Sequence, residues 1–214
     1  MGNIPKNVEV EVKFWLEDLP AFREGLINAG ISLHHPRIYE RNIRFDNAWD
    51  GLARRGQLLR LRQDARARLT FKSIPPQPAN AEAKVREEIE VEVSDFDQMH
   101  TILERIGFLP RQVYEKYRET FISPGSAESG SVEIVLDEMP FGNFVELEGE
   151  ESALKAVANQ FGLDWEKRIL DNYLTLMLRL KTQYALPFDD VTFANFAGLN
   201  ISAAGLFAQA TEDK

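Results

Sequence analysis

The chain has 214 residues, of which 44% are hydrophobic and 28% are charged. This is the composition of one folded domain, or of one domain with a small appendage. The 14 Phe, 5 Tyr and 3 Trp residues supply enough apolar surface for a sizeable core and argue against disorder over the whole length. The absence of Cys excludes disulfides, thiolate metal sites and cysteine nucleophiles. With only three His, any metal must be bound mainly by oxygen.

The net charge of −9 argues against a nucleic-acid binder that relies on a broad basic face. No run of 18 apolar residues occurs, and Met1 to Lys6 lack the apolar stretch of a secretory signal, so we expect a cytoplasmic protein that does not span a membrane. The charges are unevenly spread. Residues 54–72 contain seven basic side chains and one acid, whereas residues 133–151 contain seven acids and no base. Such charge runs are commonly solvent-exposed surfaces. The periodicity of the sequence decides whether these runs are surfaces of that kind or parts of a functional site.

Strand-period alternation and helical periodicity follow each other along the chain. In chain order we predict a strand over 8–14, a helix over 19–29, strands over 59–62, 68–72 and 86–93, a helix over 94–106, strands over 113–121, 132–137 and 145–148, and helices over 151–161 and about 171–181. Gly30, Gly107 and Gly162 end the first three helices. His34 and His35 fall between a helix and a strand, which predicts an exposed loop for both.

The polar half of each alternation is charged. In the first strand, for example, Glu9, Glu11 and Lys13 share one face and valines occupy the other. An open antiparallel sheet with one wet face would explain any single strand. All the strands together are better explained by a closed barrel whose interior is charged and whose apolar exterior is covered by helices. We therefore predict an α+β fold built on a closed antiparallel β-barrel.

The predicted interior holds more cations than a simple carboxylate substrate requires. A polyanion such as a triphosphate, whose oxygens accept paired Arg contacts, suits them better. A divalent metal such as Mg²⁺ or Mn²⁺ would reconcile these cations with the carboxylates on the same faces, because hard metal ions bind carboxylate and phosphate oxygens together. The cations concerned are Lys13, Arg60, Arg62, Lys72, Lys116 and Arg118.

Seven motifs occur in a fixed order. Glu9-x-Glu11-x-Lys13 is followed by Leu59-Arg60-Leu61-Arg62, Thr70-Phe71-Lys72, Arg86-Glu87-Glu88-Ile89-Glu90, Glu115-Lys116-Tyr117-Arg118, Leu136-Asp137 and Gly142-Asn143-Phe144-Val145-Glu146-Leu147-Glu148. Over roughly residues 6–180 this succession resembles the CYTH proteins, also called triphosphate tunnel metalloenzymes, which include class IV adenylyl cyclases, thiamine triphosphatases and inorganic triphosphatases. The resemblance implies an eight-stranded antiparallel tunnel with flanking helices.

Matched residue by residue, the resemblance also implies site roles. The triphosphate would be bound by Lys13, Arg60, Arg62, Lys72, Lys116 and Arg118, with Arg168 as the nearest candidate for a further C-terminal cation. One or two Mg²⁺ or Mn²⁺ ions would be held by Glu9, Glu11, Asp137, Glu146 and Glu148, with Glu90 added to the acidic set. Lys13 is either a catalytic group that Glu9 and Glu11 orient, or one more phosphate ligand.

The tunnel domain is expected to span residues 1–181. The apolar tail 182–214 falls outside the family pattern and should pack on the domain or on a partner, which leaves a homodimer open.

Three functions are compatible with these residues. The leading hypothesis is a metal-dependent hydrolase of inorganic tripolyphosphate or of an organic triphosphate. The second is a class IV adenylyl cyclase, which makes cyclic AMP and pyrophosphate from ATP. The third is a protein that binds polyphosphate or nucleotide without turnover, but anion binding alone gains nothing from the carboxylates. Hydrolysis leads because it demands less than cyclisation, and no unambiguous adenine pocket is evident in the sequence.

Overall fold

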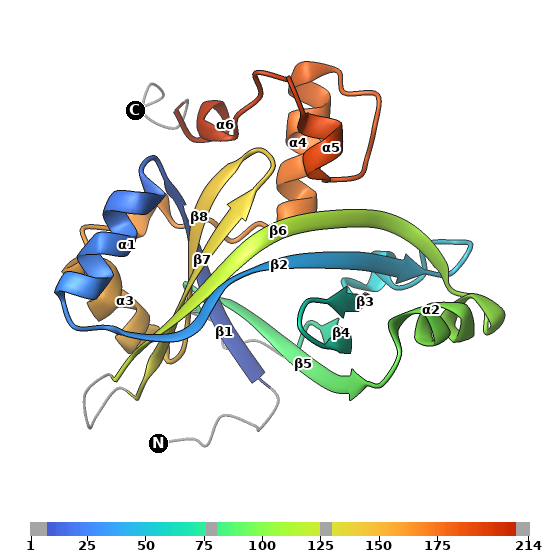
Figure 1. Cartoon of the computed structure of the whole chain (residues 1–214), viewed down its shortest axis with the longest axis horizontal. Helices are drawn as coiled ribbons and strands as arrows, with labels where there is room; N and C mark the ends of the chain where they lie inside the picture. The colour runs from blue at the N-terminus through green and yellow to red at the C-terminus, as the bar shows by residue number, and fades with distance from the viewer. Residues whose placement is uncertain (1–7, 76–80, 125–129, 209–214) are drawn as a thin grey trace.

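The computed structural model describes residues 8–75, 81–124 and 130–208. Its eight strands are β1 (Val8–Leu16), β2 (Ser32–Asp46), β3 (Leu58–Gln63), β4 (Ala67–Ser73), β5 (Lys84–Val93), β6 (Leu109–Ser123), β7 (Val132–Met139) and β8 (Gly142–Glu148). The α-helices are α1 (Leu19–Asn28), α2 (Phe96–Arg105), α3 (Glu151–Gln160), α4 (Tyr173–Tyr184), α5 (Phe193–Phe196) and α6 (Ala204–Ala208) (Figure 1). Short 3-10 turns lie at Ala53–Arg55 and Trp165–Lys167.

The strands close into a barrel in the order β1-β5-β4-β3-β2-β6-β7-β8. Every neighbouring pair is antiparallel. Ring closure satisfies the main-chain groups that an open sheet would leave at its edges. The predicted α+β fold with a closed antiparallel barrel is therefore confirmed.

The strand that alternation alone did not predict is β2, and its sequence explains why. Its pairing with β6 contains register shifts between Leu33 and His35, between His35 and Ile38, and again near its end. Pro36 lies within the second irregularity, where a residue without an N–H is tolerated. Bulges of this kind break the period of two. His34 and His35 are exposed as predicted, but they lie in β2 and not in a loop.

The apolar outer faces of the strands are covered by helices on two sides. Val12 and Phe14 of β1 pack in a cluster with Leu26 of α1 and Leu154 of α3. A separate cluster joins β2 and β3 to Phe96 and other residues of α2. Figure 1 shows α1 and α3 at one end of the molecule and α2 at the other. This arrangement puts the apolar half of each alternation outside and leaves the charged half inside.

The inner face changes from charged to aromatic at one level of the barrel. Along β1 the side chains that share the inner face run from Glu9 to Lys13 and then to Trp15, and along β8 they run from Glu146 to Phe144. The rings of Trp15 and Phe144 meet edge to face, with centroids 5.3 Å apart. An apolar cluster that includes Phe144, Leu176 and Phe196 fills this level beneath α4. The charged part of the interior thus ends at an apolar cluster.

The segment after α4 lies against the barrel of its own chain. Val191 forms a parallel bridge with Tyr114, and its N–H and C=O bond to main-chain groups of β6 at 2.8 Å each. Val191 and Phe196 are buried. Residues 209–214 of the predicted tail lie outside the described residues. Among the described helices, none is both long enough and apolar enough to cross a membrane.

Phe196→Ala should lower the free energy of unfolding by about 3 kcal/mol, because it empties a buried site in the cluster beneath α4. Urea unfolding measures the loss. Leu199→Ala is the control, since Leu199 is 45% exposed where Phe196 is 6% exposed, and it should cost less than about 0.5 kcal/mol. Equal losses for the two variants would contradict the docking of this segment.

Candidate active site

A cavity of about 1110 Å³ occupies the charged interior of the barrel. The strand period of two carries each charged side chain inward, so neighbouring strands contribute side chains at matching levels. Eleven of the predicted site residues line this cavity: Glu9, Glu11, Lys13, Arg60, Arg62, Lys72, Glu90, Lys116, Arg118, Glu146 and Glu148. Asp137 and Arg168 are not among its lining residues in the described part of the chain.

One half of the site is a network of ion pairs around Lys13. Its ammonium nitrogen lies 2.5 Å from a carboxylate oxygen of Glu146, which sits directly opposite on β8. Burial alone would lower the pKa of Lys13, but the carboxylates of Glu146 and Glu11 raise it above its usual value. The same contact, with help from Arg118, holds the pKa of the buried Glu146 well below its usual value. Lys13 therefore carries a positive charge in this network.

Asp137 lies behind this network and is fully buried. It accepts hydrogen bonds from Lys116 at 2.9 Å, from Arg118 at 2.7 and 2.8 Å, and from the Tyr173 hydroxyl at 2.8 Å. These donors occupy both carboxylate oxygens. Asp137 thus holds the cations in place, and the role of metal ligand that the family pattern implies for it stays a prediction.

The arginines of β3 form a second network. Arg62 donates to Glu90 at 2.8 Å, and Arg60 donates to the hydroxyl oxygens of Tyr114 at 3.2 Å and Thr70 at 3.3 Å. Two pairs across adjacent strands set arginine opposite arginine, Arg44 with Arg60 and Arg62 with Arg68. The buried Nε atoms of these four arginines have no hydrogen-bond partner among the described residues. Such donors suit an anion with several oxygens.

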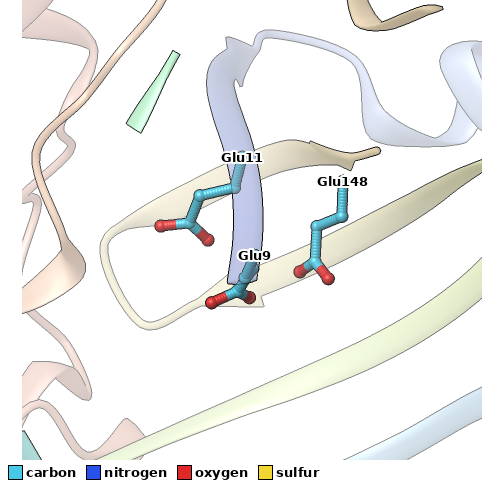
Figure 2. A group of neighbouring side chains, drawn as sticks. All are labelled: Glu9, Glu11 and Glu148. Carbon is cyan, nitrogen blue, oxygen red and sulfur yellow. The ribbon is translucent and has the colours of Figure 1, made fainter. Parts of the chain in front are cut away.

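Three carboxylates gather at another part of the cavity. Figure 2 shows Glu9 and Glu11 from β1 beside Glu148 from the adjacent β8. One oxygen from each lies within 4.8 Å of the other two. Burial, together with the charges of Glu11 and Glu88, raises the pKa of Glu9 to about 7 even though Lys72 opposes the shift. Burial and Glu9 raise the pKa of Glu148 well above its usual value.

This cluster fits a divalent cation. Close carboxylates repel one another unless a proton or a positive ion lies among them, and all-oxygen donor sets are those that Mg²⁺ and Mn²⁺ take. Glu9, Glu11 and Glu148 would hold such an ion. Glu146 and Glu90, which were predicted in the same acidic set, lie outside this cluster and pair with Lys13 and Arg62. Glu9 and Glu11 are also ion-paired, with Lys72 and Lys84, so the metal roles of Glu146 and Glu90 stay predictions.

Arg168 lies elsewhere. Its guanidinium donates to the carbonyl oxygens of Glu82 at 3.0 Å and Trp165 at 2.8 Å, and it stacks near the Trp165 ring. Those contacts tie the turn after α3 to the segment before β5. Arg168 does not line the cavity as described, and its phosphate role stays a prediction.

Several cavity residues escaped the sequence-based assignment, among them Glu40, Lys84, Glu88 and Tyr173. Glu88 shares the inner face of β5 with Glu90, so the period-two alternation in the sequence could have identified it. Lys72 and Arg60 lower its pKa to about 2 against the effect of burial. Glu40 pairs with Arg62 and Lys116 but comes from the strand that was missed. Lys84, which pairs with Glu11, precedes the predicted start of its strand.

Raising the pH should destabilise the metal-free protein through Glu9. Its carboxyl ionises near pH 4.5 in the unfolded chain and near pH 7 in the folded one. Between these values the folded state binds the extra proton, so the free energy of unfolding falls as pH rises. Glu9→Gln should remove this decline. The free energy of unfolding of the variant, relative to that of wild type, should therefore rise by on the order of 2 kcal/mol from pH 5 to pH 8. Thermal unfolding in EDTA at both pH values measures it.

The exposed Glu24 on α1 provides the matched control. Glu24→Gln should follow the wild-type pH dependence. If Glu9→Gln also kept the wild-type pH dependence, ionisation of Glu9 in the carboxylate cluster would not be the cause of the loss of stability.

Solved structures of similar fold support the architecture. A candidate adenylate cyclase of Vibrio parahaemolyticus is 22% identical, with a TM-score of 0.62 over 78% of this chain and 95% of that one. A Pyrococcus horikoshii protein is 26% identical, with a TM-score of 0.63 over 80% and 98%. A Hippeastrum protein, named as a candidate adenylyl cyclase with a dominant triphosphatase activity, is 20% identical, with a TM-score of 0.51 over 77% and 90%.

No curated protein matches the sequence. The CYTH domain model, however, matches residues 7–168, which is most of the chain and includes all eight strands of the barrel. The closed barrel with its charged cavity and this match agree. The chain belongs to the CYTH domain family.

Proposed function

We propose that the protein is a divalent-metal-dependent hydrolase of triphosphate substrates, either inorganic tripolyphosphate or an organic triphosphate. One observation carries the proposal: a single cavity contains both a set of six cations and a cluster of three carboxylates suited to a metal ion. A polyanion needs the first, and phosphoryl transfer aided by a metal needs the second. A site for anion binding alone would have no use for Glu9, Glu11 and Glu148.

The residues divide the work by charge. Arg60, Arg62 and the three lysines Lys13, Lys72 and Lys116 bind phosphate oxygens, and Arg118 adds a guanidinium that already faces two carboxylates. Lys13 stays protonated, so its contribution is to neutralise charge on the phosphates and to orient them. Glu9, Glu11 and Glu148 hold Mg²⁺ or Mn²⁺. When bound, the ion supplies charge neutralisation and Lewis acidity toward phosphate oxygens and water.

In the reaction, the oxygen of a water molecule forms a bond to the terminal phosphorus while the bond from that phosphorus to the bridging oxygen breaks. The leaving diphosphate, or the organic diphosphate, takes the bonding electrons. One proton of the water stays on the orthophosphate that forms, and the other is released to solvent. The protein has little covalent chemistry to perform. The rate comes from aligning the phosphates and neutralising the charge that develops on them.

Cyclisation uses the same cations but needs more. A ribose hydroxyl must be held in line with the α-phosphorus, which requires a site that grips the nucleoside. Hydrolysis requires only water at the terminal phosphorus. The related Hippeastrum protein, named as a candidate cyclase yet with a dominant triphosphatase activity, agrees with this order of preference.

The deciding experiment compares substrates and products. Purified protein is incubated with tripolyphosphate, ATP or thiamine triphosphate under Mg²⁺ or Mn²⁺, and orthophosphate, pyrophosphate and cyclic AMP are separated. We expect tripolyphosphate to be cleaved at least as efficiently as ATP, with release of orthophosphate, and EDTA to abolish turnover until metal is restored.

Other outcomes would redirect the proposal. Cyclic AMP and pyrophosphate from ATP, with tripolyphosphate inert, would make the protein a cyclase. Turnover that survives EDTA would remove the carboxylate cluster from the mechanism. Tight binding of triphosphate without products would identify a binding protein.

Arg60→Ala and Lys116→Ala should each raise KM for tripolyphosphate and lower kcat. Each variant loses charged hydrogen bonds worth roughly 1.5–3 kcal/mol, which corresponds to a loss of about ten- to a hundredfold in kcat/KM. Steady-state kinetics measures both constants. Arg23→Ala is the control, because Arg23 forms its ion pair with Glu119 and does not line the cavity. Wild-type kinetics in both cavity variants would refute the tunnel as the substrate site.

A further inference from the structure

Tyr173 reaches the charged cavity from a segment that follows the family match. On one edge of β1, β5 pairs only from Val8 to Glu11. At Lys13 the edge is taken by Ile169, whose N–H donates to the Lys13 carbonyl at 2.7 Å and whose carbonyl accepts from the Lys13 N–H at 3.3 Å. This bridge leads the chain along the barrel wall to Tyr173, the first residue of α4. The backbone of Lys13 therefore helps to place Tyr173.

The side chain of Tyr173 contacts three charged groups of the site. Its ring centroid lies 4.3 Å from the ammonium nitrogen of Lys13 and 5.4 Å from that of Lys116. Its hydroxyl donates to Asp137 at 2.8 Å. Tyr173 is buried, so these contacts form where water screens them little. One ring thus serves two lysines from different strands, β1 and β6.

The ring differs from the ion-pair partners of these two lysines in the described part of the chain, which are carboxylates. Glu146 and Asp137 hold the ammonium groups through negative charge, which competes directly with an incoming phosphate. An aromatic face attracts a cation through its quadrupole and carries no net charge. It can therefore keep both ammonium groups in place when phosphate oxygens replace the carboxylates as partners.

We infer that Tyr173 is a positioning residue, whose ring fixes the ammonium groups of Lys13 and Lys116 for the phosphates of the substrate. That the ligand is a triphosphate rests on the proposed function. The hydroxyl has a secondary part: through Asp137 it fixes the plane of the ring, while Asp137 keeps its bonds to Lys116 and Arg118 in any case. Removal of the ring should therefore matter much more for substrate binding than removal of the hydroxyl.

Two variants separate ring from hydroxyl. Tyr173→Leu should raise both KM and the Kd of tripolyphosphate by about tenfold or more, with a smaller change in kcat, since two cation contacts are lost. Tyr173→Phe keeps the ring and should stay within about threefold of wild type in both constants. Titration calorimetry without metal gives the Kd, and steady-state kinetics with metal gives KM and kcat.

Phe141→Leu controls for the hole that a smaller side chain leaves. Phe141 is also buried in the same apolar cluster, with its ring centroid 6.5 Å from that of Tyr173, and it does not line the cavity. It should lower thermal stability as Tyr173→Leu does but keep wild-type Kd and KM. The inference is overturned if Tyr173→Leu is as mild as Phe141→Leu, or if Tyr173→Phe loses as much affinity as Tyr173→Leu.

A spectroscopic measurement keeps this test independent of the proposed function. With lysine labelled at the ε-carbon, the ε-methylene protons of Lys13 and Lys116 should show upfield ring-current shifts in wild type and Tyr173→Phe, and lose them in Tyr173→Leu. Lys13→Arg and Lys116→Arg assign the two signals. A wild-type protein that lacks triphosphatase activity but shows these shifts would refute the proposed function and leave the placement by Tyr173 standing. Unshifted signals in wild type would refute the placement itself.

Discussion

The barrel encloses charges of both signs, and their mutual pairing is the condition that the rest of the structure depends on. A charge moved out of water without a partner costs several kcal/mol. Three pairs of adjacent strands meet this condition directly, by setting Lys13 opposite Glu146, Lys72 opposite Glu88 and Arg118 opposite Asp137. The hydrophobic pattern alone does not fix such registers, because a slip of two residues keeps every apolar side chain outside. Such a slip of β7 would set Arg118 opposite Val135 or Met139 and leave Asp137 buried without it. Charge pairing therefore specifies register as well as stabilising the interior.

Some directly opposite strand positions carry like charges, and these are the places where the proposed ligands would bind. Glu148 stands opposite Glu11 on one side and Glu133 on the other. Across the barrel, Arg60 stands opposite Arg44 and Arg62 opposite Arg68. Like charges in direct opposition destabilise a sheet unless something of opposite charge comes between them. Glu148 of the acidic run thus joins Glu9 and Glu11 in one part of the cavity, and Arg60, Arg62 and Arg68 of the basic run line another part of it.

Sequence predicted the faces of the strands better than the partners of their side chains. Period-two alternation in β1 and β8 was enough to turn Glu9 and Glu148 inward, because that depends only on local geometry. Pro36 and the bulges of β2 hid one strand and, with it, Glu40. The tie of Asp137 to Tyr173 joins residues 36 positions apart through a helix that follows the family match, and no local pattern reports it. The division of the carboxylates between metal cluster and ion pairs likewise depends on long-range register.

The pairing also links the two ligands of the proposed reaction. Lys72 lies 2.6 Å from Glu9 and 2.8 Å from Glu88, so it now supplies part of the positive charge that the acidic cluster requires. If Lys72 turns to a phosphate oxygen, Glu9 loses that charge and its affinity for a metal ion rises. By thermodynamic reciprocity, a metal ion at Glu9 makes Lys72 more available to phosphate by the same factor. Under the proposed function, each ligand would therefore prepare the cavity for the other, and the ion pairs of the empty barrel would couple the binding of an anion to that of a cation.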